Sequence, residues 1–251
     1  MSKIFENKVA IVTGGASGIG QTTAIEFAKK GAKVVVADIS DGTTTIEAIR
    51  ELGGDAIYVK TNVTKAEDVK RMVDTAVETY GHLDFAFNNA GIEKAGNLPH
   101  EYEESDFDKI YEVNLKGVWL CIKYEAEQML KQGKGIIVNT SSNLGLVAAI
   151  HDPAYVATKH GVIGLTKQAG WAYGKMGIRV NCVCPGVIRT PLLEKSLEED
   201  PAIKQLVNAT LVMGRLGETI DVANAVLWLC SDKSDFINAT ALPIDGGWLA
   251  V

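Results

Sequence analysis

The chain has 251 residues, of which 47% are hydrophobic and 22% charged, and its formal net charge is −6. These proportions exclude a disordered chain, because there is enough apolar surface to bury a substantial core. The net charge and the absence of any Lys/Arg run argue against nucleic acid or an anionic membrane as the main partner. No apolar run approaches the length of a membrane span. We therefore expect a cytoplasmic protein with a small-molecule partner.

Short runs rich in β-branched residues alternate with longer helical patterns along the chain. The expected strands cover residues 8–13, 33–38, 56–61, 83–89, 135–141 and 178–184. The expected helices cover residues 18–30, 43–53, 64–80, 103–131, 153–175 and 219–231. Strands that are apolar on both faces and separated by helices indicate a doubly wound parallel sheet, a Rossmann-like α/β fold with helices on both faces. No linker divides the chain, so we predict a single domain over residues 1–251.

Two kinds of segment stand out from this alternation. Residues 186–216 form the longest stretch outside it, and an irregular insert of this kind is either a substrate lid or a structural loop. Residues 113–130 and 158–175 are small or apolar around most of the helix circumference. Such helices are buried on more than one side, and a subunit interface is one way to achieve this.

A glycine-rich turn, "TGGASGIG", follows the first expected strand and precedes the first expected helix. Gly14, Gly18 and Gly20 allow a sharp turn and close approach of the backbone to a pyrophosphate. The helix that follows offers free N–H groups and the positive end of its dipole. This placement predicts a dinucleotide site.

The second expected strand ends at Asp38, where an acidic residue can bind the ribose hydroxyls of NAD. The same carboxylate repels the additional phosphate of NADP, and no Arg or Lys lies between Thr13 and Gly20. Asp38 can also cap the helix that follows, and this role is compatible with both cofactors. We predict NAD as the preferred cofactor.

Cysteine and histidine patterns do not indicate a metal site. The four cysteines form no CxxC pair, and Cys182 and Cys184 occupy alternate positions of one strand. Buried free thiols in a reducing compartment are the expected state. The four histidines lack metal-ligand spacing.

The stretch "HDPAYVATKHG" places Tyr155 and Lys159 four residues apart. Asp152 is a favourable helix N-cap and Pro153 suits the first helical position. Tyr155 then lies in the first turn and Lys159 one turn later, on the same face. The spacing alone also occurs by chance in surface helices.

The order of motifs along nearly the whole chain resembles the short-chain dehydrogenase/reductase family. The motifs are the glycine loop at 14–20, "NNAG" at 88–91, "VNLKG" with Asn114, "IIVNTSSNLG" with Ser142, YxxxK at 155–159 and "PGVIRT" at 185–190. The resemblance implies that Asn114, Ser142, Tyr155 and Lys159 are catalytic. It implies a cofactor site made by Gly14, Ser17, Gly18, Ile19, Gly20, Asp38, Asn62, Val63, Asn89, Ala90, Gly91, Tyr155, Lys159, Pro185, Gly186, Ile188 and Thr190. The family commonly has Asp-Val after the third strand where this chain has Asn62-Val63, and an amide can still donate to and accept from adenine.

The expected reaction moves a hydride between a secondary alcohol and NAD, while a proton moves to or from the same oxygen. Tyrosine, with a pKa of about 10, is a poor base at neutral pH. An ammonium about 4 Å away contributes about 4 kcal/mol at an effective dielectric of 20. We therefore expect Lys159 to lower the pKa of Tyr155 by about three, before the desolvation of the lysine is counted. Ser142 would hold the substrate oxygen. The resemblance implies that Lys159 also binds the nicotinamide ribose and that Asn114 braces a water in a proton relay.

The sequence selects a substrate only by class. Leu144, Val187 and Leu192 suggest a compact, moderately hydrophobic ketone or secondary alcohol, with Ser142 on its oxygen. His151 is a candidate contact but also suits a surface position, and Glu93 suits solvent better than a ligand. A 3-oxoacyl thioester reductase of the same family and a non-catalytic nucleotide-binding scaffold are the alternatives. The resemblance also implies a homotetramer.

Overall fold

The computed structural model describes residues 3–94, 98–148, 152–199, 207, 209 and 211–250. A seven-stranded sheet has the order β3-β2-β1-β4-β5-β6-β9, and all of its neighbouring strands are parallel. The strands are β1 (Val9–Thr13), β2 (Lys33–Asp38), β3 (Ala56–Lys60), β4 (Phe85–Asn88), β5 (Gly135–Thr140), β6 (Ile178–Pro185) and β9 (Ala241–Ile244). The prediction of a parallel α/β sheet is confirmed, and β9 adds a strand after the six expected ones.

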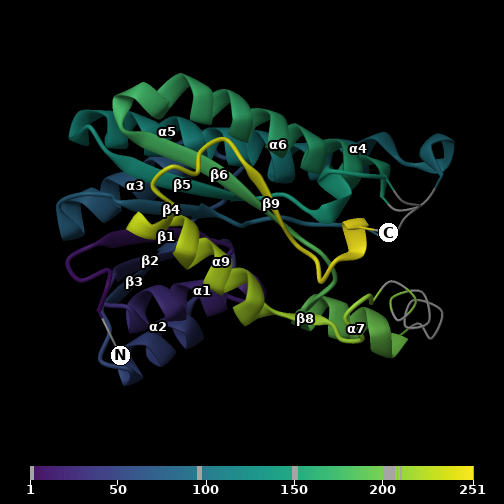
Figure 1. Cartoon of the computed structure of the whole chain (residues 1–251), viewed down its shortest axis with the longest axis horizontal. Coiled ribbons are helices and arrows are strands. Elements are labelled where there is room, and N and C mark those ends of the chain that lie inside the picture. The colour runs from purple at the N-terminus through teal and green to yellow at the C-terminus, as the bar shows by residue number, and fades with distance from the viewer. Residues whose placement is uncertain are drawn as a thin grey trace.

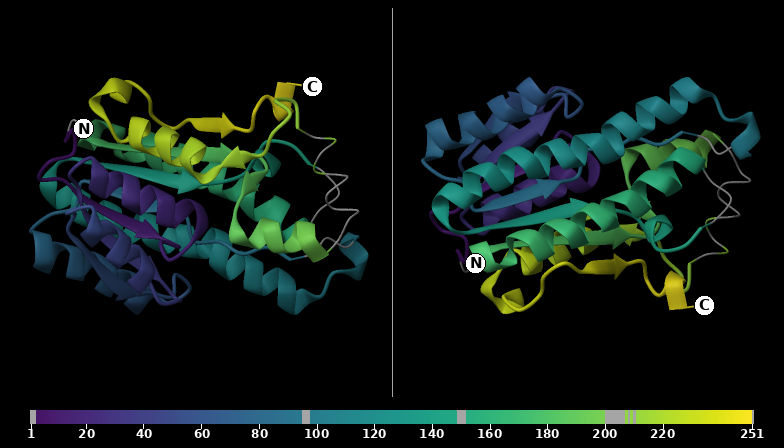
Figure 2. Two further views of the ribbon diagram at one scale, coloured as in Figure 1. Left: turned by 90° about the horizontal axis from the view of Figure 1, so that it is seen from below. Right: turned by 90° about the horizontal axis from the view of Figure 1, so that it is seen from above.

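Helices cover both faces of this sheet (Figures 1 and 2). One layer contains α1 (Gly18–Lys29), α2 (Thr43–Glu51) and α9 (Thr219–Leu229), and the other contains α3 (Ala66–Tyr80), α5 (Gly117–Gln132) and α6 (Pro153–Tyr173). Each layer encloses its own apolar core against the sheet, because the strands present buried side chains to both faces. The strands end toward the right in Figure 1, where α7 and one end of α4 also lie.

The helix expected over residues 103–131 is divided in the structure. It consists of α4 (Glu104–Tyr111), a π-helical turn (Glu112–Lys116) and α5. Asn114 lies in the π-helical turn, and its side-chain amide makes two hydrogen bonds with the main chain of Ile92. A single π-helical turn within an α-helix often marks a functional site.

The segment 186–216, which was expected to be irregular, contains regular secondary structure. β7 (Ile188–Arg189) pairs with β8 (Gly217–Glu218), and α7 (Pro191–Glu199) lies between them in the chain. The Thr190 hydroxyl accepts a hydrogen bond from the N–H of Leu193 at 3.3 Å. Thr190-Pro191 is therefore the helix-start signal of α7. Residues 200–206, 208 and 210 lie outside the described part of the chain.

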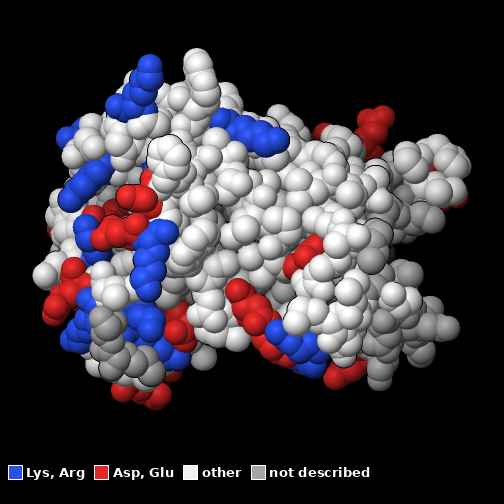
Figure 3. Space-filling view, in the orientation of Figure 1, with Lys and Arg blue, Asp and Glu red and all other residues white. Residues whose placement is uncertain are grey.

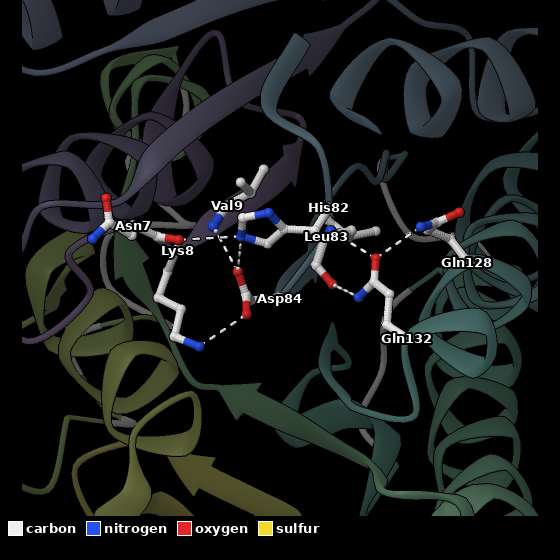
Figure 4. Close-up of polar contacts among 8 residues, drawn as sticks. All are labelled: Asn7, Lys8, Val9, His82, Leu83, Asp84, Gln128 and Gln132. Carbon is white, nitrogen blue, oxygen red and sulfur yellow. Dashed lines mark hydrogen bonds and ion pairs between the residues drawn. The ribbon is translucent and has the colours of Figure 1, made fainter. Parts of the chain in front are cut away.

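A polar cluster fixes the amino edge of the sheet, opposite the strand ends that face the site (Figure 4). The Asp84 carboxylate accepts hydrogen bonds from the Val9 N–H and from Lys8 Nζ, both at 3.0 Å. Gln132, at the end of α5, bonds both the N–H and the carbonyl of Leu83. These contacts hold the entries of β1 and β4 against the end of α5.

The four cysteines are buried and free, as expected. Among the described residues, no helix combines the length and the apolar character needed to cross a membrane.

Candidate active site

The carboxyl edge of β5 and the start of α6 position the catalytic candidates. Ser142 immediately precedes a short 3-10 turn after β5, and its hydroxyl accepts a hydrogen bond from the N–H of Leu144 at 3.1 Å. At the start of α6, the Asp152 carboxylate accepts from the N–H groups of Ala154 at 2.9 Å and Tyr155 at 3.0 Å. Asp152 therefore caps the helix as predicted, and the cap fixes Tyr155 in the first turn.

Ser142, Tyr155 and Lys159 lie together at this edge. The Ser142 side chain forms a hydrogen bond with Tyr155, and Lys159 Nζ lies 5.3 Å from the centroid of the Tyr155 ring. Lys159 is only 4% exposed, and its Nζ donates to the main-chain carbonyl of Thr140 at 2.9 Å. The main-chain carbonyl of Thr140 therefore fixes the end of the lysine, and because any residue has a carbonyl, no sequence pattern indicates this role.

Burial controls the protonation of the Tyr155–Lys159 pair. Desolvation raises the pKa of Tyr155, the negative charge of Glu93 adds to this, and the hydrogen bond with Ser142 opposes it. The net lowering of the Tyr155 pKa that was expected from Lys159 is therefore wrong for this structure, because desolvation outweighs the stabilisation of the phenolate by the hydrogen bond with Ser142. Desolvation also lowers the pKa of Lys159 to about 8, although Glu93 opposes that shift.

Asn114 is completely buried and holds the loop after β4. Its Nδ2 donates to the Ile92 carbonyl at 2.7 Å and its Oδ1 accepts from the Ile92 N–H at 2.8 Å. A Cβ on Gly91 would lie 3.4 Å from Asn114 Oδ1 and 3.6 Å from Lys159 Nζ. Asn114 and Gly91 thus lie beside Lys159, one of the catalytic candidates.

The glycine loop has the close backbone packing that a pyrophosphate site requires. Gly14 and Gly18 have positive φ angles of 64° and 55°. A Cβ on Gly20 would overlap the Gly14 carbonyl, so only glycine fits there. The Ser17 hydroxyl makes no capping bond to α1, and the first turn of that helix contains no acidic residue. The residues present therefore fit a nucleotide pyrophosphate.

Thr13 joins this loop to the "NNAG" segment. Its hydroxyl accepts hydrogen bonds from the N–H groups of Asn89 at 3.0 Å and Ala90 at 3.2 Å. Asn89 Nδ2 also donates to the Thr13 carbonyl at 3.3 Å. Thr13, at the end of β1, therefore positions the "NNAG" segment, a role that its place after an apolar run does not reveal by itself.

Asp38 faces the glycine loop from the end of β2. Its carboxylate accepts from the N–H of Ala16 at 3.0 Å and from the N–H of Ser40 at 2.9 Å. The carboxylate therefore lies between the loop and the turn after β2, where an acidic side chain can bind the ribose hydroxyls of a dinucleotide.

Asn62 and Val63 are largely occupied by contacts within the protein. Asn62 Oδ1 accepts from the N–H and the hydroxyl of Thr64, at 3.0 and 2.9 Å, and Val63 is 7% exposed. A Cβ on Gly117 would lie 2.9 Å from a Val63 methyl group. Contact with adenine by these two residues stays a prediction.

The end of β6 and the segment after it approach the glycine loop from the other side. A Cβ on Gly18 would lie 3.6 Å from a methyl group of Thr190, so the two segments are in contact range. The Gly186 N–H donates to the Ile244 carbonyl at 3.0 Å, and Pro185 pairs with Ile244 in the sheet. Ile188 is 7% exposed and packs in the core with Ile19 at its edge.

The structure describes the side chains of some predicted substrate contacts, and those of others lie outside its described part. Leu144 is 9% exposed, and Val187 lines a cavity of about 400 Å³ together with Val212 and Met213. His151 lies outside the described residues. Leu192 belongs to α7, but its side chain also lies outside the described part.

Sequence comparison decides the family. A family model described as enoyl-(acyl carrier protein) reductase matches residues 14–249. The chain belongs to the short-chain dehydrogenase/reductase family. It is an oxidoreductase of this type, and the family uses nicotinamide cofactors.

Relatives of this short-chain dehydrogenase/reductase align over nearly its full length. A 2,5-dichloro-2,5-cyclohexadiene-1,4-diol dehydrogenase of Sphingobium indicum is 40% identical, over 97% of this chain and 98% of the relative. A cyclohexanol dehydrogenase of Acinetobacter sp. is 41% identical, over 99% of this chain and 97% of the relative.

Two solved structures also resemble the short-chain dehydrogenase/reductase described here. Levodione reductase has a TM-score of 0.94 at 35% identity, over 98% of this chain and 99% of that chain. An Agrobacterium tumefaciens protein with bound NADP has a TM-score of 0.91 at 34% identity, over 99% of both chains.

Proposed function

We propose that this protein interconverts a secondary alcohol and a ketone, with NAD as its preferred cofactor. The observation that supports this most strongly is the meeting of Ser142, Tyr155 and Lys159 beside the glycine loop at one edge of the sheet. Bound NAD would supply the hydride acceptor, and NADH the donor. Gly14, Gly18 and Gly20 would hold its pyrophosphate, and Asp38 its adenosine ribose.

The side chains divide the proton chemistry between them. The Tyr155 hydroxyl exchanges a proton with the substrate oxygen, and the Ser142 hydroxyl holds that oxygen. Because burial raises the pKa of Tyr155, the residue is protonated at neutral pH and suits the donation of a proton to a ketone. Lys159, with a pKa of about 8, remains mainly cationic at neutral pH, and its positive charge would stabilise the phenolate that Tyr155 becomes once it has donated its proton. Asn114 holds the loop beside the lysine, and we assign it a place in the proton path.

The preference for NAD is based on Asp38. Its carboxylate is held by two main-chain N–H groups at the end of β2, where the phosphate of NADP would meet a negative charge. The NADP-bound relative shows that the fold also accepts the other cofactor. Parallel assays with the two cofactors test the assignment.

The substrate that we propose is a small, neutral ring ketone or its alcohol. The class rests on the apolar side chains of Leu144, two residues after Ser142, and of Val187, next to Ile188 of β7. The cavity beside β7 does not define the ring site, because it is also lined by Arg215, Asp221 and Asp245 and by none of the three catalytic candidates Ser142, Tyr155 and Lys159. The names of two relatives, cyclohexanol dehydrogenase and levodione reductase, agree with this class. The segment 186–216, which contains α7, would serve as the lid.

A thioester reductase acting on carrier-bound acyl groups is the second candidate, because of the description of the matching family model. An acidic carrier requires a basic docking face. The net charge is −6. On the face shown in Figure 3 the described Lys and Arg residues lie mainly over the left half, whereas the strands end toward the right, where the site lies. Asp38 also disfavours NADP, the cofactor that such reductases usually use. We therefore prefer the alcohol/ketone reaction.

We also propose a cytoplasmic homotetramer. The four buried free thiols suit a reducing compartment. Trp119 on α5 is 45% exposed and Trp171 on α6 is 86% exposed, which is unusual for tryptophan and suits an interface between copies. Light scattering that gives a monomer would contradict the assembly.

Nicotinamide absorbance measures the proposed reaction directly. We expect cyclohexanol to be oxidised with NAD⁺ and cyclohexanone to be reduced with NADH, with lower kcat/KM for NADP⁺ and NADPH. Tyr155→Phe keeps the ring but removes the hydroxyl, so it should bind NADH normally while turnover falls by about 10²-fold or more. Near-normal turnover of that variant would contradict the role of Tyr155. Tight NADH binding without turnover of any alcohol or ketone by the wild type would favour the scaffold.

A further inference from the structure

The loop after β4 holds Glu93 between two fixed residues. On one side, Ile92 is bonded through both its N–H and its carbonyl to the buried Asn114. On the other side, the N–H of Lys94 donates to Asp152 Oδ2 at 3.1 Å. Asp152 is fully buried and caps the helix that contains Tyr155. The position of Glu93 is therefore tied to the catalytic helix.

The negative charge of Glu93 reaches the reacting groups. It raises the pKa of both Tyr155 and Lys159, so the carboxylate lies within electrostatic range of the proton donor and of its lysine. The Glu93 side chain is exposed, whereas Lys159 is only 4% exposed, so the carboxylate is the more accessible of the two charges.

No cation in the described part of the chain forms an ion pair with this charge. Lys94, the neighbouring cation, instead pairs with Asp106 on α4. Lys159 is buried and its Nζ donates to a main-chain carbonyl. Asp152 adds a second negative charge to the field at Tyr155. Beside the cationic Lys159, the negative charges that act on Tyr155 are therefore those of Glu93 and Asp152, and of these two only Glu93 is exposed to an approaching substrate.

We propose that Glu93 is a specificity-determining residue that rejects anionic substrates and admits neutral or cationic ones. The inference rests on the alcohol/ketone activity proposed above and specifies the charge of its substrate. A carboxylate or phosphate on the ring would approach the fixed Glu93 carboxylate, and like charges in this partly exposed place repel each other. A neutral ring is not repelled by the carboxylate, and an ammonium group is attracted to it.

Three alcohols on the same ring test this selection. Cyclohexanol is neutral, trans-4-hydroxycyclohexanecarboxylate is an anion and trans-4-aminocyclohexanol is a cation at pH 7. In the wild type we expect kcat/KM for the anion to be the lowest of the three. Glu93→Gln should raise the ratio of kcat/KM for the anion to kcat/KM for cyclohexanol by about tenfold, which corresponds to about 1.4 kcal/mol. The same variant should lower the ratio of kcat/KM for the cation to kcat/KM for cyclohexanol. Glu93→Asp, which keeps the charge, should retain most of the discrimination.

Two controls separate this charge effect from a structural one. Glu78→Gln makes the same change of charge on an exposed residue of α3, near its C-terminal end, and should leave all the ratios unchanged. Higher salt should reduce the discrimination of the wild type, because exposed charges are screened. If the substitution only changed the local fold, its effect on kcat/KM would not depend on the charge of the substrate.

Calorimetry gives a readout that does not require turnover. In the NADH-bound protein, cyclohexanone should bind more tightly than 4-oxocyclohexanecarboxylate, and Glu93→Gln should narrow this difference. Unchanged ratios in both assays would overturn the role of Glu93. If no ring alcohol is oxidised by the wild type, the proposed function fails, and the binding comparison still decides whether Glu93 discriminates by charge.

Discussion

Replacement of Asp152 tests how far one carboxylate organises the site. Its Oδ1 accepts from the N–H groups of Ala154 and Tyr155, and its Oδ2 accepts from the N–H of Lys94. Asp152→Asn keeps an oxygen for the helix cap, since Asn and Asp cap equally well. It places an NH₂ group opposite the N–H of Lys94, and one lost acceptor of this kind costs about 1–2 kcal/mol. Asp152→Ala removes the cap as well, which costs about 1 kcal/mol more.

Urea unfolding and steady-state kinetics measure the two effects. We expect the free energy of unfolding to fall by about 1–2 kcal/mol in Asp152→Asn and by about 2–3 kcal/mol in Asp152→Ala. For a chain of this size the larger loss lowers the Tm by about 4–12 °C. Turnover should fall further in the Ala variant, because Tyr155 lies in the turn that loses its cap. Equal unfolding free energies for the two variants, or wild-type turnover in Asp152→Ala, would refute the reasoning.

Two further predictions concern the cofactor and pH. Asp38→Ala removes the charge that opposes the phosphate of NADP, so the preference for NAD in kcat/KM should fall by about tenfold or more; an unchanged preference would contradict the role of Asp38. Burial raises the pKa of Glu125 from 4.5 to about 8, so the folded state keeps a proton that the unfolded state releases. The stability from this proton is complete below about pH 4.5 and is lost as the pH rises to about 8, with a slope of up to about 1.4 kcal/mol per pH unit. Glu125→Gln should flatten that slope in urea unfolding from pH 5 to 8, and parallel curves for the two proteins would disprove it.

Local signals and motif order made much of this molecule predictable. The Asp152-Pro153 pair marks the start of α6 because capping depends only on neighbouring residues. The apolar runs give the strands of the parallel sheet because burial on both faces leaves a clear pattern. Placing Ser142 beside Tyr155 required the resemblance, since the residues come from different elements.

Other features depend on contacts that no local pattern reveals. The π-helical turn at Asn114 is matched to the main chain of Ile92, a distant partner in sequence. The raised pKa of Tyr155 follows from burial, which a calculation from the charge of Lys159 alone could not include. The relation of Glu93 to Tyr155 and Lys159 also required the folded loop.

The described sheet ends in short strands on both sides, and this limits how copies of the protein can associate. β3 and β9 are the outermost strands, and β9 has only four residues, one of which is Pro243. Proline lacks an N–H and protects an edge from pairing with a further strand. Growth of the sheet from one molecule into the next is therefore unfavourable at β9. Copies that associate without extending the sheet at β9 leave the hydrogen-bonded register of that edge unchanged.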